Sequence, residues 1–330
     1  MTILVTGGCG YIGSHMVHEL NDLGRSVVVL DNMTTGFRWA LPEQAKLVVG
    51  DIGDQDLART VIRRYSVTGI IHFAGSIVVP ESVADPLGYY NNNTVKSRAL
   101  IEAAVATGVE HFIFSSTAAV YGMAGELPVD EKATLEPMSP YGSSKLMTEI
   151  MLRDTSRAHK LRHVALRYFN VSGADPKGRT GQSTRGATHL IKVACETATG
   201  KRAGMEVFGT DYATRDGTCV RDYIHVTDLA RAHVAALGHL EAGGTSDVFN
   251  CGYGNGYSVL EVLEAVRRVS GHAVPAALSP RRAGDPPSIV ASSDKIRRAM
   301  NWTPAYANLD QIVRHALDWE THLARRNSAA

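Results

Sequence analysis

Short apolar runs and segments of helical length alternate along the first half of the chain. The apolar runs are rich in β-branched residues and cover residues 2–6, 26–30, 46–49, 69–73, 111–114 and 163–166. The segments of helical length lie near 11–23, 54–65, 86–107 and 140–158, with Gly24 and Gly108 placed as C-terminal caps. Unbroken apolar strands separated by helices indicate a parallel sheet that is covered on both faces. The pattern therefore predicts an α/β fold with a doubly wound parallel sheet (Rossmann), whose ligand crevice lies at the carboxyl ends of the strands.

The pattern loosens after residue 170. Residues 171–187 are rich in Gly, Asp, Pro and Thr, which suggests a loop that leaves the first domain. Beyond this loop we expect helices near 188–199, 227–240 and 308–326, a helix opened by a capping box at Ser258, and strands at 206–208 and 247–249. The predicted domains are a dinucleotide-binding domain over 1–170, to which 221–250 returns, and a smaller α/β substrate-binding domain within 171–330.

Composition excludes several classes of function. Of the 330 residues 44% are hydrophobic and 20% are charged, and the formal net charge of +1 predicts neither a nucleic-acid partner nor a membrane partner. No segment approaches the ~18 apolar residues of a membrane span, and the first residues begin a strand without the basic stretch of a secretory signal. The four cysteines form no C-x-x-C motif and the 13 histidines no H-E-x-x-H motif. We therefore expect free thiols in the cytoplasm and no metal site.

A glycine-rich turn follows the first predicted strand. Gly7, Gly10 and Gly13 stand where the strand becomes a helix, in the stretch Thr6-Gly-Gly-Cys-Gly-Tyr-Ile-Gly-Ser-His15. Glycine at such positions permits a tight turn, close approach of the backbone to a pyrophosphate, and close packing of the helix on the strand. The turn therefore predicts a bound dinucleotide.

Asp31 ends the second predicted strand, 18 residues after Gly13. An acidic side chain there can accept hydrogen bonds from the hydroxyls of the adenosine ribose, and it would repel a 2′-phosphate. Because Asn32 supplies no compensating cation, NAD is favoured over NADP. The alternative is that Asp31 only caps its loop. Asp51-Ile52 and Phe73-Ala-Gly75 follow the third and fourth strands, so they point into the same crevice.

A tyrosine and a lysine lie one helical turn apart in Ser139-Pro-Tyr-Gly-Ser-Ser-Lys145. On a helix, Tyr141 and Lys145 share one face. The hydroxyl cluster Ser115-Ser-Thr117 ends the fifth strand and places one hydroxyl near a reacting sugar oxygen, although alone it would only be a turn. A free tyrosine has a pKa near 10, so a tyrosine base needs a pKa lowered to roughly 7–8. The Lys145 ammonium and a cationic nicotinamide are the sources of that change that we expect.

Six stretches spread over nearly the whole chain match a known family. They are Gly7–Gly13, Phe114–Gly122, Tyr141–Lys145, Arg167–Asn170, Val220–His225 and Pro280–Asp285. Through them the chain resembles the extended short-chain dehydrogenase/reductases, and within these the UDP-glucose 4-epimerases. The last three stretches are the more diagnostic ones.

The resemblance implies an NAD-dependent isomerase of nucleotide-sugar metabolism, which interconverts UDP-galactose and UDP-glucose through a 4-keto intermediate and retains its NAD. It implies a homodimer formed through the helices near 86–107 and 140–158. It also implies that Tyr141 is the base, that Lys145 holds the nicotinamide ribose and lowers the pKa of Tyr141, and that Thr117 takes a hydroxyl role filled by Ser in most relatives.

Two sets of contacts follow from the same resemblance. The implied cofactor-binding residues are Gly7, Gly10, Tyr11, Ile12, Gly13, Asp31, Asn32, Asp51, Ile52, Phe73, Ala74, Gly75, Asn92, Ser115, Tyr141, Lys145 and Phe169. The implied substrate-binding residues are Thr117, Tyr141, Asn170, His189, Phe208, Arg221, Arg282 and Asp285. Arginines suit a diphosphate because their fixed donor forks bind such oxygens in pairs.

Four positions bear on the choice between related functions. Ile77 stands where some epimerases place a cofactor-contacting Lys. Ile289 falls where the residue that limits the sugar pocket, often Tyr, is expected, which leaves UDP-N-acetylhexosamines open as substrates. UDP-pentoses stay open for another reason, because pentose-nucleotide 4-epimerases share almost every motif. Ala118 and Ala119 replace the Asp-Glu pair of the sugar-nucleotide 4,6-dehydratases, so the acid and base for water elimination are missing. A non-catalytic NAD-sensing module remains the alternative from another class.

Overall fold

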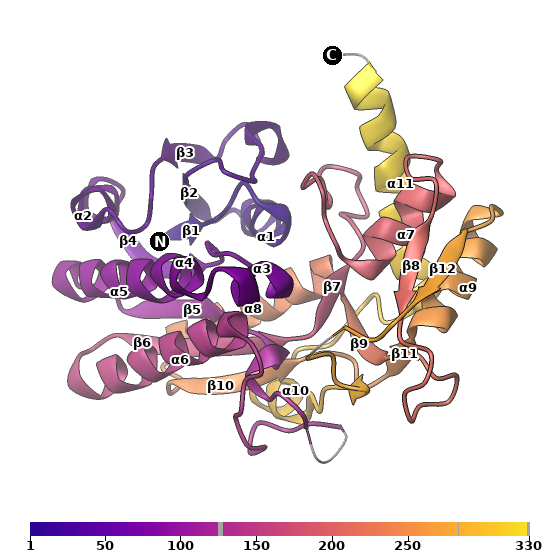
Figure 1. Ribbon diagram of the computed structural model, residues 1–330. Helices are drawn as coiled ribbons and strands as arrows, with labels where there is room; N and C mark the ends of the chain where they lie inside the picture. The colour runs from indigo at the N-terminus through magenta and orange to yellow at the C-terminus, as the bar shows by residue number, and fades with distance from the viewer. Residues whose placement is uncertain (125–127, 283, 329–330) are drawn as a thin grey trace.

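The computed structural model describes residues 1–124, 128–282 and 284–328 and contains one large sheet (Figure 1). Its seven strands are all parallel and lie in the order β10-β6-β5-β4-β1-β2-β3. They are β1 (Thr2–Thr6), β2 (Ser26–Asp31), β3 (Lys46–Val49), β4 (Val67–His72), β5 (His111–Ser115), β6 (Arg162–Tyr168) and β10 (Asp247–Cys251). The predicted doubly wound α/β fold is confirmed.

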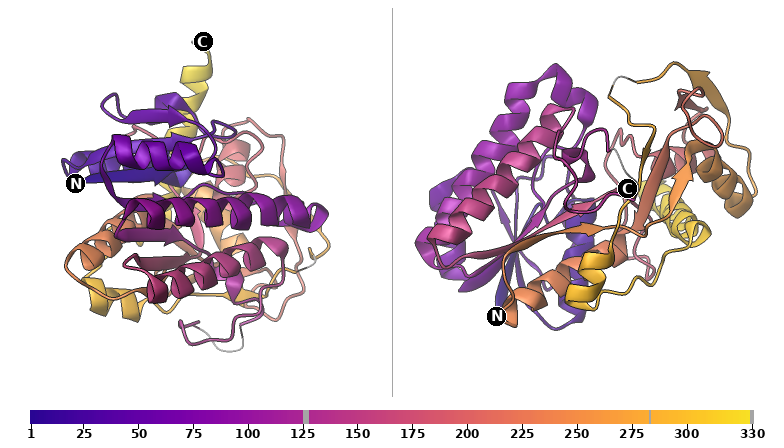
Figure 2. Two further views of the ribbon diagram at one scale, coloured as in Figure 1. Left: turned by 90° about the vertical axis from the view of Figure 1, so that its left-hand side faces the viewer. Right: turned by 90° about the horizontal axis from the view of Figure 1, so that it is seen from below.

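Both faces of the central part of this sheet are buried because strands such as β1 and β2 carry apolar side chains at successive positions. In β1, Ile3 and Val5 belong to one hydrophobic cluster, and Leu4 between them belongs to another. Since successive side chains of a strand point to opposite faces, the two clusters are the two sides of the sheet. The right-hand view of Figure 2 shows helices on both sides.

Five helices flank the sheet. Their bounds are α1 (Tyr11–Asp22), α2 (Gln55–Arg64), α5 (Lys96–Thr107), α6 (Pro140–Ala158) and α8 (Val226–Glu241). Helices α1 and α8 supply Met16 and Leu229 to the first cluster. Helices α2, α5 and α6 supply Ile62, Leu100 and Leu152 to the second. The C-terminal glycine of α5 takes the expected left-handed conformation, with φ of 77° at Gly108.

The second part of the chain builds two smaller sheets beside the large one (Figure 1). The strands of these sheets are β7 (Asn170–Ser172), β9 (Val220–His225), β11 (Gly256–Ser258) and β13 (Ser288–Ile289), and separately β8 (Met205–Phe208) with β12 (Ala276–Ser279). Their helices are α7 (Leu190–Ala198), α9 (Val259–Ser270), α10 (Asp294–Met300) and α11 (Leu309–Ser328). Ser258 and Glu261 form the expected capping box of α9.

The segment expected as one helix over 86–107 is interrupted. A short helix α3 (Val79–Ala84) precedes it, and α4 (Pro86–Tyr89) is joined to α5 by a π-helical turn, η2 (Tyr90–Val95). Within this turn the Asn93 carbonyl accepts hydrogen bonds from the hydroxyls of Ser97 and Thr148. π-helical turns are rare and are frequent at functional sites, because they shift side chains relative to a regular helix.

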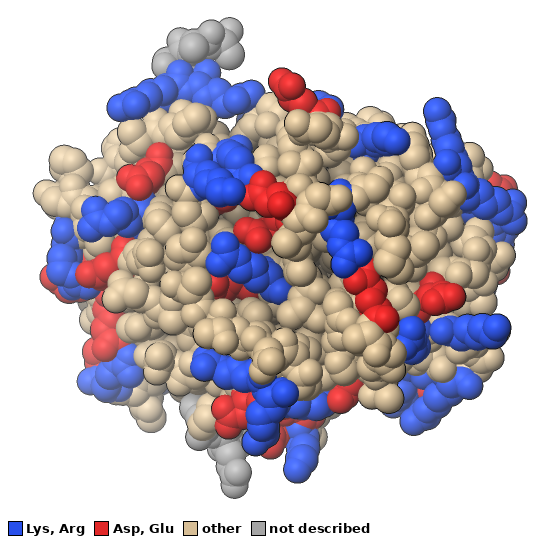
Figure 3. All heavy atoms as spheres, turned by 180° about the vertical axis from the view of Figure 1, so that it is seen from behind, with Lys and Arg blue, Asp and Glu red and all other residues tan. Residues whose placement is uncertain are grey.

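Charged groups are mixed on the surface. On the face drawn in Figure 3, Lys and Arg alternate with Asp and Glu across the molecule. None of the helices within the described ranges has both the length and the apolar character that crossing a bilayer requires.

The turn between β1 and α1 packs glycine against backbone. A Cβ at Gly7, where φ is 67°, would lie 2.7 Å from the Ala74 nitrogen. A Cβ at Gly13 would lie 2.1 Å from the Gly7 carbonyl oxygen, a separation that no side-chain adjustment can relieve. The turn can therefore hold its shape only with glycine at both positions.

We predict that Gly13→Ala lowers the free energy of unfolding by about 2–3 kcal/mol, the scale of overpacking in a filled interior. The matched control is Gly238→Ala in α8, where a Cβ meets no atom within 4 Å. At this exposed helix position alanine should stabilise the fold by up to about 1 kcal/mol. Urea unfolding of the two variants should give changes of opposite sign; equal changes would contradict the packing described for the turn.

Candidate active site

The tyrosine and the lysine predicted from sequence lie on the first turns of α6. The helix begins after Ser139, whose hydroxyl accepts a hydrogen bond from the Gly142 amide at 3.2 Å, and Pro140 occupies its first position. Tyr141 is 8% exposed and Lys145 is 4% exposed. Thr117, at the end of β5, is buried as well and hydrogen-bonds to Tyr141. The structure thus brings together all three predicted catalytic residues.

Lys145 is buried without a carboxylate among its described hydrogen-bond partners. Its Nζ donates to the Ser115 carbonyl oxygen at 3.0 Å and lies 5.0 Å from the centre of the Phe114 ring. Burial lowers the pKa of Lys145 to about 8. An ammonium group has three donors, so two remain for hydroxyl groups of a ligand in the crevice.

The pKa of Tyr141 moves in the direction opposite to the one expected. Burial raises the pKa of its phenol, and the hydrogen bond with Thr117 opposes that rise. A base near neutrality requires a lower pKa, so the protein groups around Tyr141 do not supply the change by themselves.

Asp31 is tied to the backbone of the glycine turn and to that of its own loop. One carboxylate oxygen accepts a hydrogen bond from the Cys9 amide at 2.9 Å, and the other accepts from the Met33 amide at 2.8 Å. Asp31 therefore does cap its loop. Each carboxylate oxygen has a second lone pair, so the cap leaves acceptors for ribose hydroxyls.

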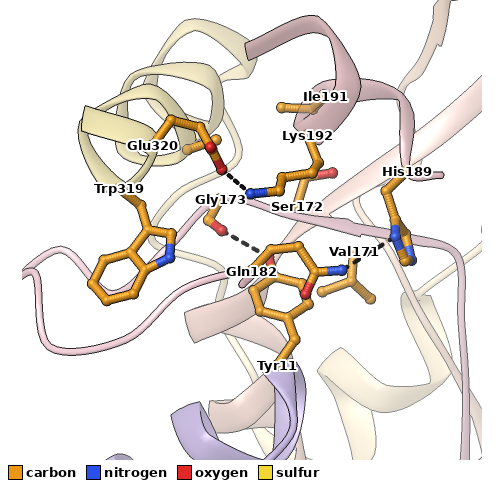
Figure 4. A pocket seen from close by; sticks show the side chains of 11 residues that line it. Tyr11, Val171, Ser172, Gly173, Gln182, His189, Ile191, Lys192, Trp319 and Glu320 are labelled. Atoms are coloured by element: carbon orange, nitrogen blue, oxygen red, sulfur yellow. Dashed lines mark hydrogen bonds and ion pairs between the residues drawn. The ribbon is translucent and has the colours of Figure 1, made fainter. Parts of the chain in front are cut away.

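Tyr11 turns its side chain away from the glycine turn. Its hydroxyl donates to the Gly173 carbonyl oxygen at 2.7 Å, in a small cavity that Gln182, His189 and Trp319 also line (Figure 4). Only the backbone of Tyr11 is thus available at the start of α1. The side chain of the neighbouring Ile12 packs against the hydrophobic cluster to which α1 and α8 contribute. Its backbone lies in the first turn of α1.

The other predicted cofactor residues lie at the ends of the strands or beside them. Asp51 accepts a hydrogen bond from Lys96 Nζ at 2.6 Å, and it is also hydrogen-bonded by Asn32. The Ile52 side chain belongs to the core. Asn92 donates to the Ser76 hydroxyl at 2.9 Å.

The loop that follows β4 begins with Phe73, Ala74 and Gly75. The Phe73 ring lies 4.7 Å from the ring of His233, and Ala74 touches the glycine turn. A Cβ at Gly75 would lie 3.0 Å from Asn93 Oδ1 and 3.7 Å from Lys145 Nζ, so this loop borders Lys145.

Two further predicted cofactor residues lie at the ends of β5 and β6. The hydroxyls of Ser115 and Tyr168 are hydrogen-bonded at 2.5 Å. Phe169 is buried in one cluster with Ile289 and Ala118. This cluster joins the segment after β5 to β13.

Sequence reasoning missed Asn93. Its Oδ1 accepts from the Ser76 amide at 2.7 Å, and its Nδ2 donates to the Ser76 carbonyl at 2.9 Å and to the Ser144 hydroxyl at 3.0 Å. Asn93 thereby joins the loop after β4 to α6 next to Lys145. Three consecutive asparagines were the available signal, but only the π-helical turn shows which of them faces inward.

A second group of predicted residues gathers on the smaller sheets. Arg282 Nε lies 2.9 Å from Asp285, and Arg221 lies 3.7 Å from the same carboxylate. The Arg282 guanidinium stands 4.8 Å from the centre of the Phe208 ring. Ile289 pairs with Arg221 across β13 and β9. Two cations, one carboxylate and an aromatic face therefore converge from segments far apart in the sequence.

Asn170 and His189 flank this region. Asn170 opens β7 and pairs with Tyr223 of β9. His189 precedes α7, lies 3.3 Å from Gln182 Nε2, and has a pKa lowered by burial (Figure 4). Among the residues that the structure describes, no group of three or more His, Cys, Asp or Glu side chains could hold a metal ion.

Comparison with known proteins agrees with this geometry. Residues 3–252 match the NAD dependent epimerase/dehydratase family. A UDP-glucose 4-epimerase of Azospirillum brasilense is 56% identical over 97% of this chain and 92% of its own length. The crystal structure of the UDP-glucose 4-epimerase of Brucella ovis in complex with NAD is 44% identical, with a TM-score of 0.93 over 96% of this chain and 97% of that chain.

A further solved structure carries both a cofactor and a nucleotide. The UDP-glucose 4-epimerase of Bifidobacterium longum in complex with NAD+ and UDP is 37% identical, with a TM-score of 0.93 and 98% of each chain covered. The match to the family spans more than half of the residues, and the similarity to the relatives extends over nearly all of them. The chain therefore belongs to the NAD dependent epimerase/dehydratase family.

Proposed function

We propose that this chain interconverts UDP-galactose and UDP-glucose. The observation that carries the proposal is the buried group of Tyr141, Lys145 and Thr117 at the carboxyl ends of the large sheet, with a separate arginine pair formed by Arg221 of β9 and Arg282 between β12 and β13. The first group suits proton transfer at a sugar hydroxyl, and the second suits a diphosphate. The names of the similar proteins support the same activity.

The crevice fits NAD in three respects. The glycine turn leaves backbone free to approach a pyrophosphate, Asp31 keeps acceptors for the adenosine ribose, and Lys145 keeps two donors for the nicotinamide ribose. The carboxylate of Asp31 would repel a 2′-phosphate, which favours NAD over NADP. When bound, NAD takes up a hydride from C4 of the sugar and returns it to the other face.

Tyr141 takes the proton of the sugar 4-hydroxyl in this proposal, and Thr117 hydrogen-bonds to the same oxygen. Because burial raises the pKa of Tyr141, the proton can leave only when positive charge lies next to the phenol. The cationic nicotinamide supplies such a charge, and the Lys145 ammonium adds to it. The phenol then returns its proton to the 4-keto oxygen as the hydride returns to C4.

Arg221 and Arg282 bind the diphosphate of the UDP-sugar, and Asp285 holds both guanidiniums in place. Asn170, His189 and Phe208 complete the nucleotide site. Firm binding of UDP with a loosely held hexose lets the 4-keto sugar rotate about its bond to the diphosphate. Rotation presents the other face of C4, which is what inversion requires.

A wider sugar range is the second candidate function. Ile289 is 7% exposed and packs with Phe169, so an aliphatic side chain occupies the position that limits the sugar pocket. UDP-N-acetylhexosamines and UDP-pentoses are the alternative substrates. Turnover of UDP-N-acetylgalactosamine and UDP-xylose beside UDP-galactose distinguishes them.

We also propose which parts of the chain form the cofactor-binding domain and which form the substrate-binding domain. Residues 1–170, with 221–250, form the NAD-binding domain, and 171–330 hold the UDP-sugar. Pairing of β10 with β6 and packing of α8 beside α1 support the return of 221–250. Strand β9 pairs instead with β7, β11 and β13, so residues 220–225 lie at the boundary. The four cysteines are free thiols, which fits a reducing cytoplasm.

The diphosphate assignment is tested with two neighbouring arginines. Arg282→Ala should weaken UDP binding by roughly 1.5–3 kcal/mol, the scale of a hydrogen bond to a charged group. The control is Arg281→Ala, since the Arg281 guanidinium bonds Asp211 at 2.7 Å and lies 4.2 Å from the Tyr212 ring. Calorimetric titration with UDP should separate the two variants; equal affinities would place the nucleotide elsewhere.

A homodimer is the assembly that we propose. Val95 at the end of η2 and Met147 and Ile150 of α6 are 54%, 42% and 40% exposed, and such apolar side chains are suited to a second copy of the chain. Light scattering should give twice the chain mass of 35.5 kDa, and Ile150→Glu should shift it toward the monomer. Leu260→Glu on α9, at the same exposure of 40%, is the matched control and should stay dimeric.

The catalytic role of Tyr141 is tested by removing one oxygen atom. Tyr141→Phe should lower kcat by at least ~10²-fold while NAD content and UDP affinity persist, because proton transfer contributes to the transition state and not to ground-state binding. In the unmodified enzyme kcat should fall as the pH drops through the apparent pKa of Tyr141. Lys145→Met should move that pKa upward, because loss of a cation destabilises the phenolate. A Tyr141→Phe enzyme with normal kcat would remove the tyrosine from the chemistry.

A further inference from the structure

A loop over residues 32–40, whose last three residues form the 3-10 helix η1 (Arg38–Ala40), contacts the glycine turn. It leaves the end of β2 directly after Asp31, and the Phe37 amide donates to the Cys9 carbonyl oxygen at 2.9 Å. Gly36 lies so close that a Cβ on it would be 2.5 Å from the Cys9 Cβ. The position of this loop therefore decides how open the crevice is on the side where Asp31 meets the dinucleotide.

The outer end of the loop is held by the C-terminal helix. Trp39 stacks on Trp319 of α11 with ring centres 6.0 Å apart and planes inclined by 30°, and the Arg326 guanidinium lies 4.3 Å from the Trp39 ring. The Phe37 ring lies 5.1 Å from Trp39 on the loop itself. Trp39 is half-buried through these contacts. The loop next to Asp31 thus depends on an element that is almost the whole chain away.

The side chain of Trp319 is held in place by its surroundings. It is 3% exposed, and its indole nitrogen donates to the Ser183 hydroxyl at 3.1 Å. Gly181 leaves room for the indole, since a Cβ there would lie 2.4 Å from the ring. The next residue, Glu320, is ion-paired with Lys192 of α7, as Figure 4 shows, and with Lys201 at 2.6 Å. Because α11 is held in place on this side, movement must occur in the loop.

We infer that the contact between Trp39 and Trp319 is a clasp that slows the release of NAD. The inference rests on the proposal that NAD lies across the glycine turn with its adenosine ribose at Asp31. For that end of the dinucleotide to leave, the loop over 32–40 must move away from Cys9, and this movement separates the stacked rings. Trp39 is therefore a positioning residue for cofactor retention and touches neither the reacting carbon nor the base.

The test is the rate at which the purified holoenzyme loses NAD. Enzyme charged with labelled NAD is mixed with an excess of unlabelled NAD, and the label that remains bound is followed after rapid desalting. Trp39→Ala should release NAD at least about fivefold faster, because ring stacking and the cation contact are both lost. Trp39→Phe keeps a ring and should fall between. Trp319→Phe, which alters the same contact from α11, should also speed release.

The matched control is Tyr65→Ala. Tyr65 is a half-buried aromatic residue after α2 with the cations of Lys46 and Arg64 at 5.3 and 5.4 Å, but it is not part of the clasp. It should release NAD at the rate of the unmodified enzyme. The inference is overturned if Trp39→Ala and Trp319→Phe both retain NAD like the unmodified enzyme, or if Tyr65→Ala releases it as fast as they do. An unmodified enzyme that carries no NAD would contradict the cofactor assignment itself.

Discussion

One buried ion pair holds α6, the helix of the proposed base Tyr141, in place on the sheet. Arg167 of β6 and Glu149 of α6 meet at 2.6 Å with side chains only 4% and 5% exposed, and Glu149 also accepts a hydrogen bond from the Ser116 hydroxyl. Glu149 lies one turn beyond Lys145 on the same helix face. The pair thereby holds α6 against β6, and the bond to Ser116 links α6 to the segment directly after β5, which also carries Thr117. Two charges so deeply buried require full pairing, and leaving either one alone would cost several kcal/mol.

The same pair extends toward the substrate side. The Arg167 guanidinium donates to the Tyr121 hydroxyl at 3.0 Å, which donates to Asn250 Oδ1 at 2.6 Å, and Asn250 Nδ2 donates to the Val129 carbonyl at 2.9 Å. The Val129 amide in turn donates to the carbonyl oxygen of Val290, which is next to Ile289. The proposed catalytic groups lie in the buried part of this frame, whereas Arg282 is half exposed at its rim. Proposed chemistry and proposed recognition are thus separated by solvent access, so proton transfer occurs where charges act strongly.

The sequence was sufficient to predict structural features that depend on neighbouring residues or on an unbroken apolar run. Strand β1 and the glycine turn follow from neighbouring residues, and an uninterrupted apolar run such as residues 27–30 of β2 has few alternatives to a buried parallel strand. Strands β11 and β13 were missed, because two or three residues carry no periodicity. The meeting of Arg221, Arg282 and Asp285 came only from resemblance, since spacing along the chain does not bring them together. The rise in the pKa of Tyr141 was not predicted. Its main cause is burial of the phenol, and burial is known only once the chain is packed.

Strand β10 forms one edge of the large sheet. Its outer edge would present unpaired backbone groups, but the Asn250 amide donates to Glu131 at 2.7 Å and the Val248 carbonyl accepts from Lys295 at 2.8 Å. Charged side chains from two distant segments thus occupy the positions that another strand would need. A chain that stopped before residue 247 would lose this guarded border and leave the edge of β6 open to pairing with other chains. Protection of this edge therefore depends on β10 and Lys295, which are synthesised after the strand that they shield.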